Sequence, residues 1–210
     1  MDVLPLYQRL LAIAQSGKAF GKDLYDQERY QEIETIALTL MSQLGNEPIE
    51  TLHNLFAAEK GYATPKVDVR AFITKDNQVL LVQDSHTKEW SLPGGFAEVG
   101  LSPIENIQLE VLEETGLTVN VGPLLAIFDT QQTNSPQTFQ FYKFVFACEV
   151  LSGTFNANAE TIAASYFSWE QLPTLSKKRT TNEQLNILKD LEKGIHIDGG
   201  LSNGNKSPNN

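Results

Sequence analysis

Apolar residues recur at steps of three and four through the first 60 positions, which is the period of an amphipathic helix. The longest stripe lies within residues 26–44 and is followed by Gly45 as a stop signal. A helix that ends near Gly17 is expected before it, and a shorter helix over residues 50–58 is expected after it. Two or three helices in about 60 residues enclose only a small core, so this segment is expected to dock on another surface.

From residue 66 onward the hydrophobic pattern alternates, which is typical of β-strands. Strands are predicted over residues 67–73 and 79–82, joined as a hairpin by the turn Asp76-Asn77. The other predicted elements are strands at 119–129, 139–151 and 164–169 and a helix within 180–193. The fold class predicted from this order is α/β (α+β), with a mixed sheet.

The same patterns divide the chain into three parts. A helical N-terminal domain is expected at residues 1–62 and a mixed domain at 66–193, with Pro65 at the boundary between them. Residues 195–210 form a polar, glycine-rich tail that is expected to be disordered.

Composition narrows the function classes. The formal net charge of −10 argues against broad contact with nucleic acid or an anionic membrane. No apolar run approaches the roughly 20 residues that span a bilayer, and the N-terminus lacks the order of a signal peptide, so a cytoplasmic location is expected. The single cysteine, Cys148, is expected to be a buried strand thiol. His53 and His86 show no metal-ligand spacing and are expected to be ordinary surface positions.

Residues 90–95 predict a short strand that ends in a glycine-containing turn, and a well-signalled helix follows. Ser102 suits the N-cap, Pro103 suits the first helical position, and Glu105 completes a capping box. Gly116 provides the stop, so a helix is predicted over residues 103–115.

Three carboxylates share one side of this predicted helix. At roughly 100° per residue, Glu113 lies about 60° to one side of Glu110, and Glu114 lies about 40° to the other side. A hard divalent cation, Mg²⁺ or Mn²⁺, prefers oxygen ligands and would cancel the repulsion among them. A solvated acidic helix face is the alternative, and for an isolated motif it is the more common explanation.

This loop and helix resemble the Nudix box, G-x5-E-x7-R-E-U-x-E-E-x-G-U, in which U is apolar. The matching residues are Gly95, Glu110, Val111, Glu113, Glu114, Gly116 and Leu117. Leu101 and Leu109 stand where the box has its first Glu and its Arg. Replacing both partners of an ion pair by leucines can be neutral or stabilising, so we interpret the double change as an apolar contact in place of the pair. The resemblance covers roughly residues 66–193 and implies an α/β/α sandwich.

The first 60 residues resemble the N-terminal helical domain of Nudix hydrolases that act on X-linked nucleoside diphosphates, a group that includes enzymes for CDP-choline or ADP-ribose. Segments 11–20 and 22–30 carry this resemblance within the helical domain. It continues in the second domain at residues 123–129, 141–144 and 159–161. Ala159 stands where that group usually has His, so no ring is available there. The helical domain is expected to mediate a homodimer or to cover the active site, because its apolar stripe needs a neighbour.

Residue roles follow from the carboxylate pattern and from the resemblance. Glu110 and Glu114 are the first candidate metal ligands, with Glu113 close behind. The resemblance adds the Gly94 carbonyl and Glu98 as further ligands.

Glu160 is the candidate general base that orients or deprotonates the attacking water, with an exposed loop acid as the equal alternative. Arg70 is the best candidate for a phosphate contact, because a guanidinium binds phosphate with two hydrogen bonds. Lys143 is a weaker candidate, and a solvated strand lysine explains it as well. Trp90, Phe128 and Tyr142 could stack on a base, but strand aromatics are more often part of the core.

Three functions stay open at this stage. The leading one is a metal-dependent pyrophosphohydrolase that splits a nucleoside diphosphate linked to X, a small nucleotide substrate, into a nucleoside monophosphate and phospho-X. The second is a catalytically weak Nudix-fold ligand sensor, motivated by the leucines at 101 and 109. The third is RNA end processing, which the acidic balance disfavours.

Overall fold

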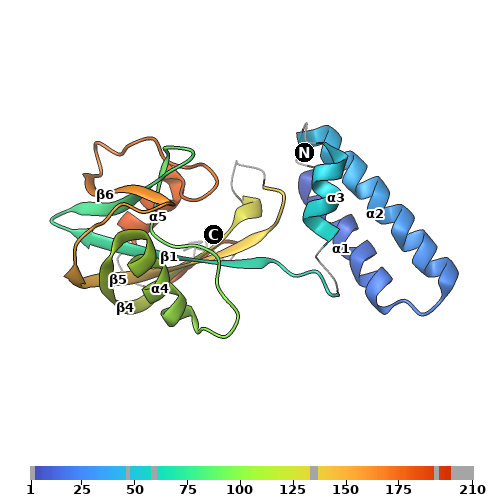
Figure 1. Ribbon diagram of the computed structural model, residues 1–210, viewed down its shortest axis with the longest axis horizontal. Coiled ribbons are helices and arrows are strands. Elements are labelled where there is room, and N and C mark those ends of the chain that lie inside the picture. The colour runs from blue at the N-terminus through green and yellow to red at the C-terminus, as the bar shows by residue number, and fades with distance from the viewer. Residues whose placement is uncertain (1–2, 46–47, 58–60, 133–136, 192–193, 200–210) are drawn as a thin grey trace, which may run out of the picture. The chain divides into compact units, whose positions relative to one another are not determined.

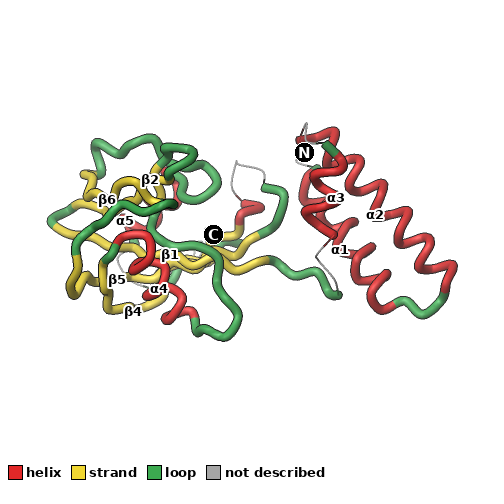
Figure 2. The backbone as a smooth tube through the Cα atoms, in the orientation of Figure 1, coloured by secondary structure: helices red, strands yellow, loops and turns green. Residues whose placement is uncertain are grey.

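The computed structural model describes residues 3–45, 48–57, 61–132, 137–191 and 194–199. The chain divides into two compact units, Met1–Pro65 and Lys66–Asn210. The first unit is helical and the second contains all the strands of the described residues (Figures 1 and 2). In the described part of the chain, no helix is long and apolar enough to cross a membrane. The expected disorder of residues 195–210 is wrong where the tail is described, because His196–Ile197 form strand β7, which pairs with residues 126–127. From residue 200 onward the tail lies outside the described residues.

Three helices make up the first unit. They are α1 (Leu4–Phe20), α2 (Leu24–Gly45) and α3 (Ile49–Ala57). The predicted end of the first helix near Gly17 is wrong, because Gly17 is a packing position: a Cβ there would lie 2.4 Å from the ring of Tyr30 on α2. Glycine at this position lets the two helices approach closely, and the chain turns only after Phe20. The core of the unit is formed by Leu11, Ala14, Ala37, Leu38, Met41, Leu52 and Phe56.

The second unit is built on a seven-stranded sheet. Its strands are β1 (Lys66–Lys75), β2 (Gln78–Asp84), β3 (Trp90–Ser91), β4 (Leu117–Asp129), β5 (Phe141–Gly153), β6 (Thr161–Ser168) and β7 (His196–Ile197). The order along the sheet is β3-β2-β1-β5-β4-β7, and β6 pairs with β2. β1 pairs with β5 in parallel and with β2 as the predicted antiparallel hairpin, so the sheet is mixed as expected. The short strand expected at Trp90 is confirmed as β3, whereas β7 and the 3₁₀ turn η1 (Thr130–Gln132) were not predicted.

Helices α4 (Pro103–Thr115) and α5 (Asn182–Asp190) cover opposite faces of this sheet. Neighbouring residues of one strand point to opposite faces. On β5, Val145 packs in the cluster that contains Leu185 and Leu188 of α5. The next residue, Phe146, packs in the cluster that contains Ile107 and Val111 of α4. The predicted α/β/α layering is confirmed.

The ends of α4 are fixed by local signals. Ser102 accepts a hydrogen bond from the Glu105 backbone N–H, and the Glu105 carboxylate accepts one from the Ser102 N–H. Gly116 adopts a left-handed conformation with φ of +72°, and its N–H donates to the Leu112 carbonyl. The predicted helix over 103–115 is confirmed at both ends. Its carboxylates therefore lie at helical spacing, as predicted.

Candidate active site

The loop before α4 lies directly beside β1. Val69 N–H donates to the Gly95 carbonyl at 2.8 Å, and Ala71 N–H donates to the Pro93 carbonyl at 2.9 Å. Gly94 lies between these bonds with φ of +132°, and a Cβ on it would lie 2.1 Å from the Val69 carbonyl oxygen. Only glycine fits this approach without displacing the backbone. The loop is therefore pressed onto the strand at the point where it meets the helix α4.

Asn106 holds the far end of the same loop. Its side chain is 2% exposed, and its Oδ1 accepts the Glu98 N–H at 2.7 Å. Its Nδ2 donates to the carbonyls of Leu101 and Ser102. Sequence reasoning missed this residue, because an Asn in the first turn of a helix usually signals only capping. Its effect is to keep Glu98 in place at the edge of the pocket that this loop and α4 line.

Glu114 and Glu110 are the carboxylates that α4 turns toward the loop. Glu114 is buried, and its Oε2 accepts the Gly94 N–H at 2.7 Å. Burial raises the pKa of Glu110 to about 7, and the neighbouring charge of Glu114 acts in the same direction, while Arg70 partly offsets both. Burial also raises the pKa of Glu114. Burial is thus the main cause of both shifts, and a bound cation would favour the charged form of both carboxylates.

Glu113 faces a different direction from the other two. It is exposed and does not line the pocket, although its charge still raises the pKa of Glu110. Among the described residues no three His, Cys, Asp or Glu side chains are grouped closely enough to form a ready-made metal cluster. Like charges repel when no ion lies between them, and Glu114 is instead hydrogen-bonded to the loop. The predicted role of Glu113 as a ligand stays a prediction.

Arg70 lines the pocket but is already heavily engaged. Its Nε and Nη2 donate to the two carboxylate oxygens of Asp68 at 2.7 and 2.8 Å, and its Nη1 donates to the Leu92 carbonyl at 3.0 Å. It is 3% exposed. Three of the five N–H groups of the guanidinium are therefore bound within the protein. The predicted phosphate contact stays a prediction, and the side chain also ties β1 to the strand that leads into the loop.

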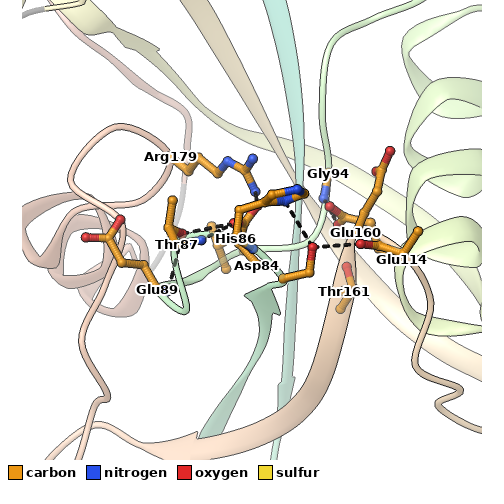
Figure 3. A network of polar contacts seen from close by, with 12 residues as sticks. Asp84, His86, Thr87, Glu89, Gly94, Glu114, Glu160, Thr161 and Arg179 are labelled. Carbon is orange, nitrogen blue, oxygen red and sulfur yellow. Dashed lines mark hydrogen bonds and ion pairs between the residues drawn. The ribbon is translucent and has the colours of Figure 1, made fainter.

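Asp84, at the end of β2, lines another part of the pocket together with His86 in the segment after it. Its Oδ1 accepts hydrogen bonds from the backbone N–H groups of His86 and Thr87 and from the Thr87 hydroxyl. Its Oδ2 pairs with Arg179 at 2.8 Å, as Figure 3 shows. These hydrogen bonds and the Arg179 charge lower the pKa of Asp84 to about 2, against the opposing effect of burial. An Asp with Thr three residues later is a signal of such a turn, and sequence reasoning did not use it.

Lys143 does not line the pocket, and the alternative of a solvated lysine is wrong. Its side chain is 3% exposed, and its Nζ donates to the backbone carbonyls of Lys178 and Arg179. The register of the parallel strands places Lys143 beside Asp68, which draws the lysine inward. Burial lowers its pKa to about 8. The geometry gives no support to a direct substrate contact from this residue.

Glu160 is held next to α4 by two neighbouring residues. The Oδ1 of Asn158 accepts the N–H groups of Glu160 and Thr161, and its Nδ2 donates to the Glu113 carbonyl at 2.7 Å. Ser85 N–H donates to the Glu160 carbonyl at 2.7 Å. The charge of Glu160 raises the pKa of Glu114, so the two carboxylates are close enough to interact. Figure 3 shows them at the same side of the site.

A single pocket of about 530 Å³ brings these walls together. Its lining is formed by Arg70, Asp84, His86, Gly94, Gly95, Phe96, Ala97, Glu98, Glu110, Glu114, Glu160 and Arg179. Five of these side chains are carboxylates and two are guanidinium groups. The predicted residues Arg70, Gly94, Glu98, Glu110, Glu114 and Glu160 thus meet in one cavity. His86 also lines it, and its side chain is exposed, as expected for a surface position.

The aromatic residue at this pocket is not one of those proposed from the sequence. Phe128 is 1% exposed and belongs to the core, and Trp90 packs on Phe167 with ring centroids 4.7 Å apart. Phe96 is 62% exposed, lines the pocket and stacks on Phe141 at 5.3 Å with an interplanar angle of 4°. Its exposed ring is a surface on which a flat group can stack.

The two leucines that replace box residues lie in different environments. Leu101 is 37% exposed in the loop, and Leu109 is half-buried on α4. Neither belongs to the buried clusters of the described chain. The interpretation that they replace an ion pair by an apolar contact stays a prediction.

Comparison with known proteins identifies both units. The family described as "UDP-X-like, N-terminal oligomerisation domain" matches residues 1–56, and the NUDIX domain matches residues 64–191. The Bacillus subtilis (strain 168) protein named "Putative ADP-ribose pyrophosphatase YjhB" is 44% identical over 184 residues, which cover 87% of this chain and 88% of that protein.

Solved structures agree with these matches. A crystal structure of a UDP-X diphosphatase aligns with a TM-score of 0.64 and 40% identity, over 94% of this chain and 98% of that one. An ADP-ribose pyrophosphatase from Streptococcus suis 89-1591 aligns with a TM-score of 0.58 and 37% identity, over 64% of this chain and 100% of that one. The NUDIX match spans more than half of the residues, and the chain therefore belongs to the Nudix hydrolase family, with a UDP-X-like N-terminal oligomerisation domain.

Proposed function

We propose that the protein is a metal-dependent pyrophosphohydrolase that cleaves a nucleoside diphosphate linked to X, with ADP-ribose as the first substrate to test. The observation that carries this proposal is the single pocket in which loop, helix and distant-loop carboxylates face two guanidinium groups. Such a mixture suits a diphosphate, whose oxygens bind cations and whose hydrolysis needs a base. The names of the relatives from Bacillus subtilis and Streptococcus suis point to the same substrate, and CDP-choline is the second to test.

The residues fit a divalent cation. Nudix hydrolases generally use divalent metal ions, and Mg²⁺, with Mn²⁺ as the alternative, matches a donor set made only of oxygens. Glu110, Glu114 and Glu98 would hold it, together with the Gly94 carbonyl. Burial first and the Glu114 charge second raise the pKa of Glu110, and such an ion would oppose both effects. When bound, the ion screens the charge of the diphosphate and makes the attacking water more acidic.

The side chains of the protein supply the other steps. Glu160 orients the attacking water and accepts a proton from it. The water oxygen bonds to one phosphorus while the bridging P–O bond breaks, and the electron pair leaves with the other phosphate. The products are a nucleoside monophosphate and phospho-X. Phe96 offers its exposed ring to a flat group of the substrate.

The test is a hydrolysis panel with ADP-ribose, CDP-choline and NADH in the presence of Mg²⁺ or Mn²⁺, with product identification. We expect AMP and ribose 5-phosphate from ADP-ribose, and we expect Glu114→Gln to lose turnover while remaining folded. Glu149→Gln is the matched control, since Glu149 is exposed on β5 and outside the pocket. Binding without turnover across the panel would favour the ligand-sensor function, and activity only on oligonucleotides would favour RNA end processing.

We further propose that the N-terminal unit, Met1–Pro65, joins two copies into a homodimer. Its match to an oligomerisation domain supports this, as do the large apolar side chains that it leaves exposed. Those of the first two helices are Leu6, Leu10, Ile13, Phe20, Leu24, Tyr25, Ile36 and Leu44. Light scattering at micromolar concentration should give twice the chain mass of 23.3 kDa. A mass of one chain would contradict the dimer.

A further inference from the structure

Arg179 is a pocket cation that the box motif does not contain. It follows β6 in the segment that leads into α5, about 70 residues after the carboxylates of α4. Its side chain is 45% exposed, and it lines the same cavity as Glu110 and Glu160. Its charge lowers the pKa of Glu114, so its field reaches the catalytic helix.

Arg70 and Arg179, the two arginines of this cavity, are not equivalent. Arg70 is 3% exposed, with three N–H groups bound to Asp68 and Leu92. Arg179 is half-exposed, and its guanidinium contact is with a single carboxylate oxygen of Asp84. A guanidinium binds phosphate through unoccupied N–H groups that solvent can reach. Arg179 meets this condition far better than Arg70 does.

Asp84 is placed to orient Arg179. Its Oδ1 is filled by three hydrogen bonds from residues 86–87, which leaves Oδ2 for the guanidinium. The carboxylate cannot rotate without losing those bonds, so it presents a fixed anchor on one side of Arg179. Figure 3 shows this arrangement, with Arg179 reaching across to Asp84.

The backbone beneath Arg179 is fixed from the interior by Lys143. The buried ammonium donates to the carbonyls of residues 178 and 179. The next residue, Thr180, is 1% exposed and accepts the Leu92 N–H at 3.0 Å. The segment is thereby tied to β5 and to the strand that enters the glycine loop. A buried lysine that donates to two backbone carbonyls and does not line the pocket would act on the substrate through the residues it positions.

We propose that Arg179 is the side chain that binds a phosphate oxygen of the diphosphate, and that Lys143 is a positioning residue that sets Arg179 in place. This rests on the proposed function. It assigns to Arg179, between β6 and α5, the phosphate contact that was expected of Arg70 on β1. Loops in general tolerate changes of length and sequence, so a contact from this segment is a means by which substrate choice can be changed without altering the box.

The test measures ADP-ribose hydrolysis and the binding of α,β-methylene-ADP-ribose by calorimetry, both with Mg²⁺. We expect Arg179→Gln to raise KM and to weaken analogue binding about 10- to 100-fold, as for a lost hydrogen bond between charged groups. Arg179→Lys should recover part of the loss. Lys177→Gln is the matched control, because it removes a neighbouring exposed charge outside the pocket and should leave both values unchanged.

A double-mutant cycle tests the positioning role of Lys143. Lys143→Met should raise KM several-fold in the wild-type background and add nothing in the Arg179→Gln background, with circular dichroism confirming the fold. Additive effects would overturn the positioning role. Unchanged KM and analogue binding in Arg179→Gln, with an active wild-type enzyme, would overturn the Arg179 contact and leave the proposed function intact. Wild-type protein that neither hydrolyses nor binds would overturn both proposals.

Discussion

Gly94→Ala is the sharpest test of how the glycine loop is built. A Cβ at this position would lie 2.1 Å from the Val69 carbonyl oxygen, far inside van der Waals contact, and φ of +132° is unfavourable for alanine. The conformational strain costs about 1–2 kcal/mol. If the loop moves to relieve the clash, the hydrogen bond from Gly94 N–H to Glu114 is lost, which costs about 1.5–3 kcal/mol for a charged acceptor.

The expected total is a loss of about 2.5–5 kcal/mol in the free energy of unfolding. Gly100→Ala is the matched control, since Gly100 has φ of +98° in the same loop and nothing within 4 Å of its Cβ position. That variant should lose only the strain, about 1–2 kcal/mol. The assay is urea unfolding followed by tryptophan fluorescence, with ADP-ribose hydrolysis measured on the folded variants.

The two alanine variants should also differ in turnover. Gly94→Ala displaces Glu114 and should lower kcat strongly, whereas Gly100→Ala should leave it nearly unchanged. If both variants unfold at the same urea concentration and Gly94→Ala hydrolyses substrate as the wild type does, the close approach of loop and strand does not govern the site.

Three further predictions follow from named contacts. Asn158→Ala should lower kcat and change KM less, because Asn158 joins the Glu160 segment to the end of α4. An unchanged kcat would count against that role. Cys148 should react slowly with iodoacetamide at pH 8 until the protein is unfolded, because burial raises its pKa to about 12; rapid labelling of the native protein would contradict this. Asp84 has a folded-state pKa of about 2, below its unfolded value, so the stability it contributes is present above about pH 4 and is lost as the pH falls toward 2. The difference in unfolding free energy between wild type and Asp84→Asn should shrink over that acid range in urea titrations, and a constant difference would refute the assignment.

Local sequence determined the elements and the box carboxylates. The capping box at Ser102 and Glu105 and the left-handed Gly116 depend only on residues a few positions apart, so α4 could be predicted at both ends. Gly17 failed as a stop signal because its role is a contact with Tyr30, which lies 13 residues away on another helix. Short-range patterns cannot register such contacts, because they carry no information on which helices pack together.

The tertiary structure alone decided how the pocket is completed. Arg179, Asp84 and Glu160 come from three separate segments, and strand pairing and loop contacts bring them together. The parallel register of β1 and β5 places Lys143 beside Asp68, and the lysine is buried, neither solvated nor at the pocket lining where it was a candidate. Charge and hydrogen bonding act over a few ångströms in space, regardless of separation along the chain. The sequence by itself therefore determined which carboxylates lie on the helix, and the fold determined which cations face them.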